Sequence, residues 1–396
     1  MTTLNPRRIV LPSGLLGSWR RLPLLDRWML GELIGPLVFG VAAFTAVSLS
    51  VGAVFELVRR VAESGLPLDV ALQVLLLELP SFLVLSFPMA TLMATLLTYS
   101  KLSGNSELTA LRSVGVPTWR MLVPAVVLAV AMTMLTFGFN EAVVPSTLSQ
   151  AEATLSRAIG RAVAGEQRDN VVYSKYGRVE LPDGSTERGL THIFYAQRFN
   201  KGVMEDVTLL DLSRSAHRVM LTADRARWSS RDAQWEFLDG QVVGIGSSGS
   251  EAITSARFDR YLYPLGNQPL KVAKLPKDAN EMSIGQARTA ERLLRESGDL
   301  RAARKLRVRI QEKFSFPAVC LVFGLIGSSL GARPHSRRSR SQGFGLTVLL
   351  IFGYYLVAFS FSSLGVKGTL TPLLSAWMPV LIGLGTGLVL VRQASR

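Results

Sequence analysis

Residue types that support chemistry are scarce in this chain of 396 residues. It contains one cysteine, Cys320, and three widely separated histidines, His192, His217 and His335. A single cysteine cannot build a disulfide framework, and the histidine spacing matches no zinc site. The sequence also lacks the metalloprotease pattern H-E-x-x-H and the phosphate-binding pattern G-x-x-x-x-G-K-[ST]. We therefore expect no metal, no cofactor and no catalytic residues in this chain.

Long apolar runs are abundant instead. Hydrophobic residues make up 48% of the chain and charged residues only 18%. A helix needs about 20 apolar residues to cross the ~30 Å hydrocarbon core of a membrane. Six segments meet this requirement: 29–55, 70–98, 119–140, 314–332, 343–364 and 371–391. The second contains Pro80 and Pro88, which predict kinks. The pattern is typical of a multi-pass membrane protein.

The basic residues that flank these spans lie mostly on one side. Fourteen Lys and Arg residues occupy the chain ends, the loop after span two and the loop after span four, against three on the other side. Basic flanks remain in the cytoplasm, so both termini are predicted to be cytoplasmic and the 141–308 insert external. That insert is nearly balanced, with 25 basic and 21 acidic residues. Of the net charge of +15, +11 therefore accompanies the spans and their flanks, and we expect no nucleic-acid partner.

The external insert has the alternation of a β-domain. Val219, Leu221 and Ala223 alternate with polar residues, as do Trp235 and Phe237. Turn-forming residues recur at Pro182-Asp183-Gly184, Asn200-Lys201-Gly202, Asp239-Gly240 and Gly246-Ser247-Ser248-Gly249. Short strands between such breakers predict an antiparallel sandwich, a jelly roll or an open barrel.

Helical patterns flank this β-domain. Residues 142–163 continue out of span three, and residues 283–307 form a helical segment with Ser283 as N-cap and a break at Gly298. We therefore expect an α-helical membrane protein with six transmembrane helices and an all-β domain between helices 3 and 4. The expected divisions are 1–140, 141–282 and 283–396.

Ionisable residues lie near the ends of the spans rather than at mid-membrane. Arg59 and Arg60 follow span one, and Glu312 and Lys313 open span four. Such residues either anchor helix ends or form a charged rim that binds the headgroup of an amphiphile. Glycine pairs within the spans predict close helix packing: Gly31 with Gly35, Gly327 with Gly331, and Gly383 with Gly387.

The loop between spans two and three contains a short amphipathic helix. The segment from Ser106 to Gly115 ends at a glycine, with Pro117 beyond it. Acidic, apolar and basic groups lie on it at Glu107, Leu108, Leu111 and Arg112. Such a helix is either a solvated connector or an element that fits a groove on a cytoplasmic partner and transmits its motion.

Three segments resemble the lipopolysaccharide-export permeases LptF and LptG. They are the paired-proline stretch LPSFLVLSFPMA at 79–90, the loop LSGNSELTALRSVG at 102–115, and FPAVCLVFGLIG at 316–327 followed by Leu330-Gly331. The loop has the family form S-E-L-x-A-L-R-x-x-G, and the similarity extends over nearly the whole chain. The basic residues that the family's second subunit carries near span one have only Arg59 and Arg60 as counterparts here.

The resemblance implies an architecture and partners. Members have six spans in the bacterial inner membrane and a periplasmic β-jellyroll after the third. Two permease subunits, paralogues or identical copies, pair around a lateral cavity on a dimeric cytoplasmic ATPase. A coupling helix corresponds to 104–116, its coupling acid to Glu107, and the gate to 29–55 and 343–364. The substrate is lipopolysaccharide, which passes to a periplasmic jellyroll bridge protein.

We therefore expect a non-catalytic permease subunit of an ATP-driven lipopolysaccharide exporter. ATPase coupling is assigned to Glu107, Leu108, Leu111, Arg112 and Gly115, and a lipid path to the sheet interior at Leu221, Phe237 and Phe258. Two alternatives are an ion-coupled secondary transporter, which requires titratable groups at mid-membrane, and a membrane-anchored periplasmic scaffold or sensor, which requires a cytoplasmic output domain.

Overall fold

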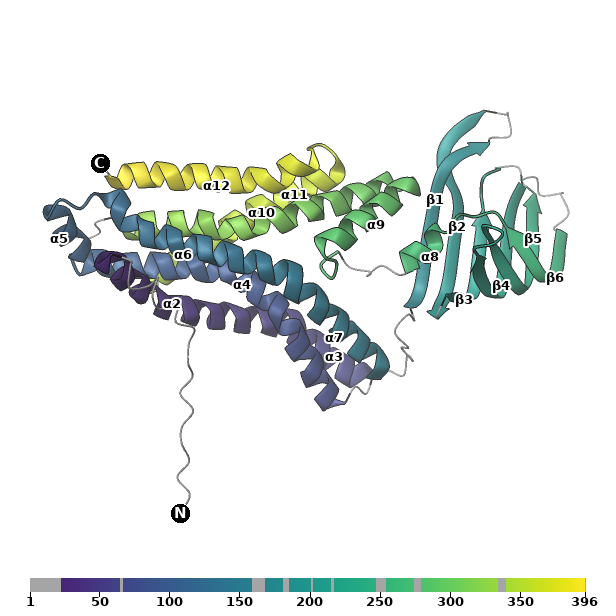
Figure 1. Cartoon of the computed structure of the whole chain (residues 1–396), viewed down its shortest axis with the longest axis horizontal. Helices are drawn as coiled ribbons and strands as arrows, with labels where there is room; N and C mark the ends of the chain where they lie inside the picture. Colours follow the sequence, from purple (N-terminus) through teal and green to yellow (C-terminus); the bar gives the residue numbers. More distant parts are fainter. Residues whose placement is uncertain are drawn as a thin grey trace, which may run out of the picture.

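The structure is a computed structural model that describes residues 23–64, 67–158, 168–180, 185–200, 202–214, 217–246, 254–273, 279–333 and 340–395. Figure 1 shows an elongated molecule with a helical bundle and, beyond one end of it, a β-sheet. The other end carries the short helix α5 (Glu107–Ser113), and the first and last helices begin and finish near it. These two ends are called the sheet end and the α5 end.

Six helices in the described residues are long and apolar enough to cross a membrane, which confirms the six predicted spans. Two of them contain a π-helical turn, so that α2 (Leu24–Leu49) continues through η1 (Ser50–Val54) into α3 (Phe55–Ser64), and α6 (Thr118–Gly138) continues through η2 (Phe139–Val143) into α7 (Val144–Ala158). The others are α4 (Leu68–Gly104), α10 (Leu300–Gly331), α11 (Arg340–Lys367) and α12 (Pro372–Ser395).

The outer faces of these helices are apolar. On α11, for example, Leu349, Phe352 and Phe359 are all exposed. An apolar outer face is stable where lipid replaces water, because helices satisfy their backbone hydrogen bonds internally. Helix α4 has 37 residues, which corresponds to roughly 55 Å at 1.5 Å per residue. It therefore exceeds the ~30 Å hydrocarbon core, and Pro80 and Pro88 both lie inside it.

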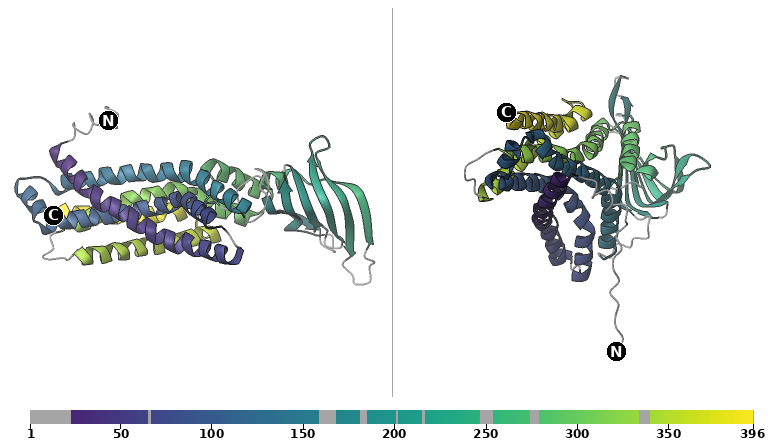
Figure 2. Two further views of the ribbon diagram at one scale, coloured as in Figure 1. Left: turned by 90° about the horizontal axis from the view of Figure 1, so that it is seen from below. Right: turned by 60° about the vertical axis from the view of Figure 1, so that its left-hand side comes forward.

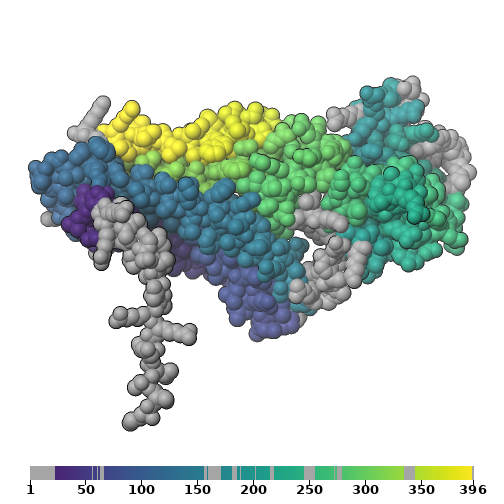
Figure 3. Space-filling view, viewed as in Figure 1, coloured from purple at the N-terminus to yellow at the C-terminus, as the bar shows by residue number. Residues whose placement is uncertain are grey.

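Helix α10 lies at the centre of the bundle. Its glycines provide close contacts, because a Cβ added at Gly327 would lie 2.2 Å from Thr95 Oγ1, and one at Gly331 would lie 2.8 Å from the Leu96 carbonyl of α4. Gly383 and Gly387 of α12 pack against α10 in the same way. Figure 3 shows the C-terminal helices, in yellow and light green, lying along the first spans in blue.

Gly31 and Gly35 of α2 make no close helix contact within the described part of this chain. A Cβ added at either position would meet no atom within 4 Å. Both glycines lie on the exposed side of α2, together with Ile34 and Val38. The sequence pattern indicates a close-packing face, but no described residue of this chain covers it.

The β-domain is one antiparallel sheet of six strands in sequential order. The strands are β1 (Arg168–Glu180), β2 (Thr186–Asn200), β3 (Val203–Asp211), β4 (His217–Ser229), β5 (Gln234–Gly246) and β6 (Thr254–Tyr263). Figure 2 shows them side by side in a curved sheet. The all-β expectation is confirmed in the form of an open meander, in which each strand pairs with its neighbours in the chain.

One predicted turn is wrong. Asp239-Gly240 lies inside β5, where Asp239 has a φ of 55° and is skipped between the pairs Leu238–Arg260 and Gly240–Phe258. The facing residue Asp259 of β6 is skipped at the same point, so the register is the same on either side and the strand continues. Aspartate tolerates the left-handed backbone better than most residues, so the dipeptide that resembles a turn lies within a continuous strand.

The inner face of the sheet carries a dense aromatic core. Phe194 and Trp235 lie 5.0 Å apart between ring centroids, and Phe237 packs beside them. The segment after β6 covers this core, because Leu265 and the helix α8 (Gln268–Ala273) pack on it and the Trp235 indole donates to the Gly266 carbonyl at 3.0 Å.

A helical hairpin joins the sheet to the bundle. Helix α9 (Ile284–Glu296) begins at Ser283, which forms a capping box with Gln286, and the chain turns at Gly298, whose φ is +85°. Both predicted signals are confirmed. The Tyr176 amide of β1 donates to the Ser297 carbonyl at 2.6 Å, so the turn that leads into α10 is bonded directly to the sheet.

The glycine contacts of α10 lead to a testable difference between two conservative substitutions. Gly327→Ala is expected to lower the thermal unfolding midpoint of the purified protein, because overpacking of this kind costs about 1–3 kcal/mol. Gly385→Ala is the control, because its Cβ meets nothing within 4 Å. Equal midpoints for the two variants would contradict the packing.

Candidate functional site

The short helix α5 is fixed at both ends by its local sequence. Ser106 precedes it in the left-handed region, with a φ of 61°, and the Asn105 side-chain amide donates to Glu107 Oε1 at 2.9 Å. At the other end Gly115 adopts a φ of +90°, and the Val116 amide donates to the Leu111 carbonyl. A glycine in this conformation is a common helix stop, as the sequence predicts.

The apolar side of α5 faces the bundle. Leu108 is buried in a cluster with Met29 and Leu33 of α2 and with Tyr99 of α4, and Leu111 packs at its edge. Leu108 and Leu111, predicted as coupling residues, therefore attach α5 to its own chain. Arg112 does the same, because its Nη2 donates to the Ala332 carbonyl at the end of α10 at 3.2 Å.

The sequence analysis missed two exposed apolar residues near α5. Val114, in the loop after α5, is 83% exposed, and Trp119, in the first turn of α6, is 59% exposed. Both lie outside the amphipathic 3.6-residue pattern of α5, and the available signal was their apolar character between charged residues. Val114 and the half-exposed Glu107 are among the residues at the surface of the α5 end.

A partly buried ion pair holds the first turns of two spans together beside α5. Arg120 of α6 donates from Nη1 to Asp26 Oδ1 and from Nη2 to Asp26 Oδ2, each at 2.7 Å. Asp26 lies in the first turn of α2. The Tyr99 hydroxyl donates to the Met121 carbonyl at 2.6 Å in the same region. The α5 end is thus a set of specific contacts among α2, α4, α5, α6 and α10.

The residues predicted to form a charged rim do not converge. Arg59 lies exposed on α3, and the side chain of Arg60 lies outside the described part of the structure. Glu312 accepts a hydrogen bond from Arg309, and Lys313 is buried with no hydrogen-bond partner for its Nζ among the described residues. Figure 1 shows α3 well separated from α10, so two separate places carry these charges.

The residues predicted to line a lipid path do come together. Leu221 and Phe237 are fully buried in the sheet core, and Phe258 packs partly buried against it. The core is therefore filled, and an apolar guest can enter only if the covering segment around α8 moves.

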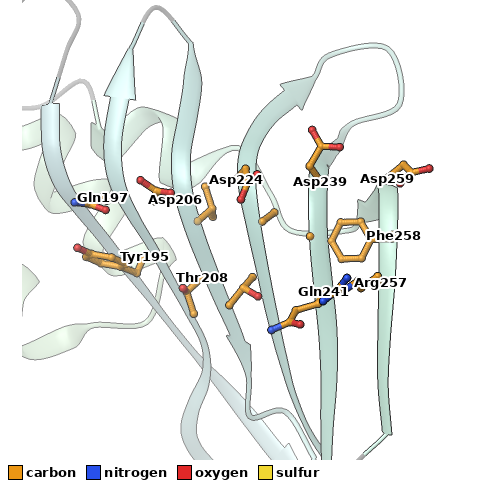
Figure 4. Close-up of a pocket in the computed structure, with 14 residues that line it drawn as sticks. Tyr195, Gln197, Asp206, Thr208, Asp224, Asp239, Gln241, Arg257, Phe258 and Asp259 are labelled. Carbon is orange, nitrogen blue, oxygen red and sulfur yellow. The ribbon is translucent and has the colours of Figure 1, made fainter.

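A separate hollow of about 740 Å³ lies across the sheet. Figure 4 shows its polar lining, with one aspartate from each of four successive strands: Asp206, Asp224, Asp239 and Asp259. Thr208, Thr222 and Gln241 line it as well, and these residues alternate with the core positions. Val207, Ala223 and Phe258 line it too, so the hollow borders the apolar core. No three His, Cys, Asp or Glu side chains in the described residues are arranged to hold a metal ion.

A polar network joins two diagonal corners of the sheet. The Tyr263 hydroxyl of β6 donates to Asp211 Oδ2 of β3 at 2.6 Å and lies 3.1 Å from His192 Nε2 of β2. Burial lowers the pKa of His192, although Asp211 acts in the opposite direction. Burial acts to raise the pKa of Asp211, but hydrogen bonds from Ser213 and Tyr263 outweigh it and lower that pKa.

Comparison with known proteins gives one family. The family model described as "Lipopolysaccharide export system permease LptF/LptG" matches residues 27–393. A search of curated proteins found no match. The family match covers all six apolar helices, the loop with α5 and the sheet.

The polar network makes the sheet sensitive to acid. His192 and Asp211 both have lowered pKa values in the folded state. The contribution of His192 to stability is complete above about pH 6.5 and decreases as the pH falls below that value, because the unfolded chain binds the proton first. The contribution of Asp211 is lost in the same way only below about pH 4. Hydrogen exchange of β2 and β6, corrected for intrinsic rates, should therefore accelerate several-fold between pH 7 and pH 5. His192→Gln should reduce this difference, and an unchanged difference would contradict the assignment.

Proposed function

Because the chain belongs to the family of lipopolysaccharide export system permeases LptF/LptG, we propose that it is a transmembrane subunit of an ATP-driven exporter. In this function it extracts lipopolysaccharide from the inner membrane and passes it to a periplasmic β-domain. The observation that carries the proposal is the family match over 27–393, combined with six apolar helices and a sheet at one end of the bundle.

The proposed orientation places the α5 end in the cytoplasm and the sheet in the periplasm. The distribution of basic residues supports it, because fourteen flank the spans on the α5 side and three on the other. In Figure 1 the start of α2 and the end of α12 lie at the α5 end as well.

The proposed energy source is a separate dimeric ATPase in the cytoplasm. The chain itself lacks a phosphate-binding loop. Helix α5 is the proposed contact, with Glu107 as the coupling acid that the family resemblance implies and Val114 as an exposed apolar residue beside it. In this proposal the side of α5 that faces the bundle does not contact the ATPase. It connects α5 to the other helices through Leu108, Leu111 and Arg112.

A second permease subunit, either a paralogue or another copy of this chain, is the proposed partner within the membrane. The exposed faces of α2 and α11 support it, and the glycines Gly31 and Gly35 leave room for a close helix contact on α2. Two such subunits would enclose a cavity with a gate at the α2 and α11 helices.

The proposed route continues through the sheet because acyl chains cannot cross water cheaply. Each CH₂ group exposed to water costs about 0.8 kcal/mol, so several acyl chains cost tens of kcal/mol. The core around Leu221 and Phe237 is the apolar interior available beyond the bundle. The outer edge of β6, which pairs with no further strand among the described residues, suits strand addition by a periplasmic jellyroll bridge protein.

The coupling role of α5 can be tested by charge reversal. Glu107→Arg is expected to weaken ATPase association about 10-fold or more, because like charges at an interface cost several kcal/mol. Co-purification and lipopolysaccharide export should fall together. The control is Glu152→Arg, which makes the same change at an exposed position on α7. Wild-type association and export in Glu107→Arg would refute the assignment of this residue.

The lipid route can be tested by crosslinking. A photoreactive phenylalanine analogue at Phe258 should crosslink lipopolysaccharide only when the complex hydrolyses ATP, because this side chain borders the sheet core. The same analogue at the neighbouring Arg257, an exposed residue on the polar face, should not crosslink. Equal labelling at both positions, or none at 258 during active export, would exclude this route.

A further inference from the structure

The Asp26–Arg120 pair is the most directional contact near α5. Each of the two terminal guanidinium nitrogens of Arg120 donates to a different carboxylate oxygen of Asp26, both at 2.7 Å. The Asp26 side chain is only 12% exposed and the Arg120 side chain 28%. Arg–carboxylate pairs with two parallel hydrogen bonds fix the relative orientation of their partners, which a single point contact does not. The first turn of α2 therefore cannot rotate or slide against α6 without breaking both bonds.

Arg120 is also close to α5 along the chain. Only residues 114–117 separate the last residue of α5 from Thr118, the first of α6. Leu108 contributes to an apolar cluster that includes Met29 and Leu33 of α2. The α5–α6 segment thus contacts the start of α2 at two places, through the ion pair and through Leu108. No described residue of α11 belongs to this cluster.

We propose that the Asp26–Arg120 pair is the positioning contact that passes a displacement of α5 to α2. Asp26 and Arg120 touch neither nucleotide nor lipid in this role, and they act by making α2 follow α5 and α6. The inference rests on the proposed function, in which α5 meets the ATPase and α2 forms one side of the gate. It adds that the displacement of α5 reaches α2 directly, whereas α11 moves only in response to the movement of α2.

A second ion pair in the same region provides a matched control. Lys101 of α4 and Glu32 of α2 also lie 2.7 Å apart, but by a single contact, with side chains 49% and 33% exposed. Exposed pairs of this kind contribute little, whereas breaking a buried one leaves an uncompensated charge. The Glu32→Gln variant thus removes a carboxylate from the same helix without disturbing the forked contact.

The experiment uses the full chain with its ATPase and second permease subunit in vesicles that contain lipopolysaccharide. The measured quantity is the amount of lipopolysaccharide exported per ATP hydrolysed. Asp26→Asn and Arg120→Lys are expected to lower this ratio about 5-fold or more, the lower range of coupling energies, while ATPase association and basal ATP hydrolysis stay unchanged. Glu32→Gln should retain the wild-type ratio.

A distance measurement reports the movement itself. Spin labels at Thr109→Cys on α5 and Val47→Cys on α2 occupy exposed positions, and the single native cysteine, Cys320, is buried. Each of these two labels is paired with a second label at Leu381→Cys on α12. Adding a non-hydrolysable ATP analogue should change the distribution of distances from α12 to α5 and from α12 to α2. In Asp26→Asn the α5 distances should still change, but the α2 distances should not.

The outcomes separate the two levels of the argument. If the wild-type complex exports no lipopolysaccharide upon ATP hydrolysis, the proposed function fails. If the wild type exports and both variants keep its ratio, or lose ATPase association in proportion to export, the positioning role of the pair is refuted. If Asp26→Asn fails to assemble, the export ratio of Arg120→Lys alone tests the proposal. This variant keeps the positive charge and loses only the two parallel hydrogen bonds of the guanidinium group.

Discussion

The close contact of α10 with α4 is the interaction on which the rest of the structure depends. Lipid offers no hydrophobic gain when helices associate, so packing of small residues and specific hydrogen bonds must hold a bundle together. Gly327 and Gly331 allow α10 to approach the α4 backbone, and Gly383 allows α12 to approach α10. Because α10 also begins at the turn bonded to β1, the same helix sets the position of the sheet relative to the bundle.

Local sequence signals predict the elements of this fold well. Apolar length locates the six spans, and the Ser283 cap and the Gly298 break bound α9, because caps and left-handed glycines are encoded within a few residues. Alternation predicts the strands and places Leu221 and Phe237 in one interior. Asp239-Gly240 was misassigned because a left-handed aspartate occurs both in turns and at an irregular position inside a strand, and local sequence does not distinguish them.

Contacts between distant segments are the part that sequence patterns do not predict. Arg112 reaches the carbonyl of Ala332, Asp26 pairs with Arg120, and Tyr263 meets Asp211. No periodicity connects these partners, because each pair depends on how helices or strands pack in three dimensions. The same reason explains why the apolar residues of α5 were assigned to an external partner: their amphipathic spacing indicates a buried face without indicating what buries it.

The strand pairing of the sheet is interrupted at the same height on every strand. Each successive pairing skips one position, along a line through Gln197, Asp206, Asp224, Asp239 and Asp259. A sheet that lacks ladder hydrogen bonds along one line has a crease, and it flexes there more easily than elsewhere. The crease divides the sheet into two plates, and each plate keeps its own hydrogen bonds when the angle between them changes. Tyr263 lies on one plate and Asp211 on the other, so their hydrogen bond links the two plates, as does the ring contact between Phe194 and Trp235.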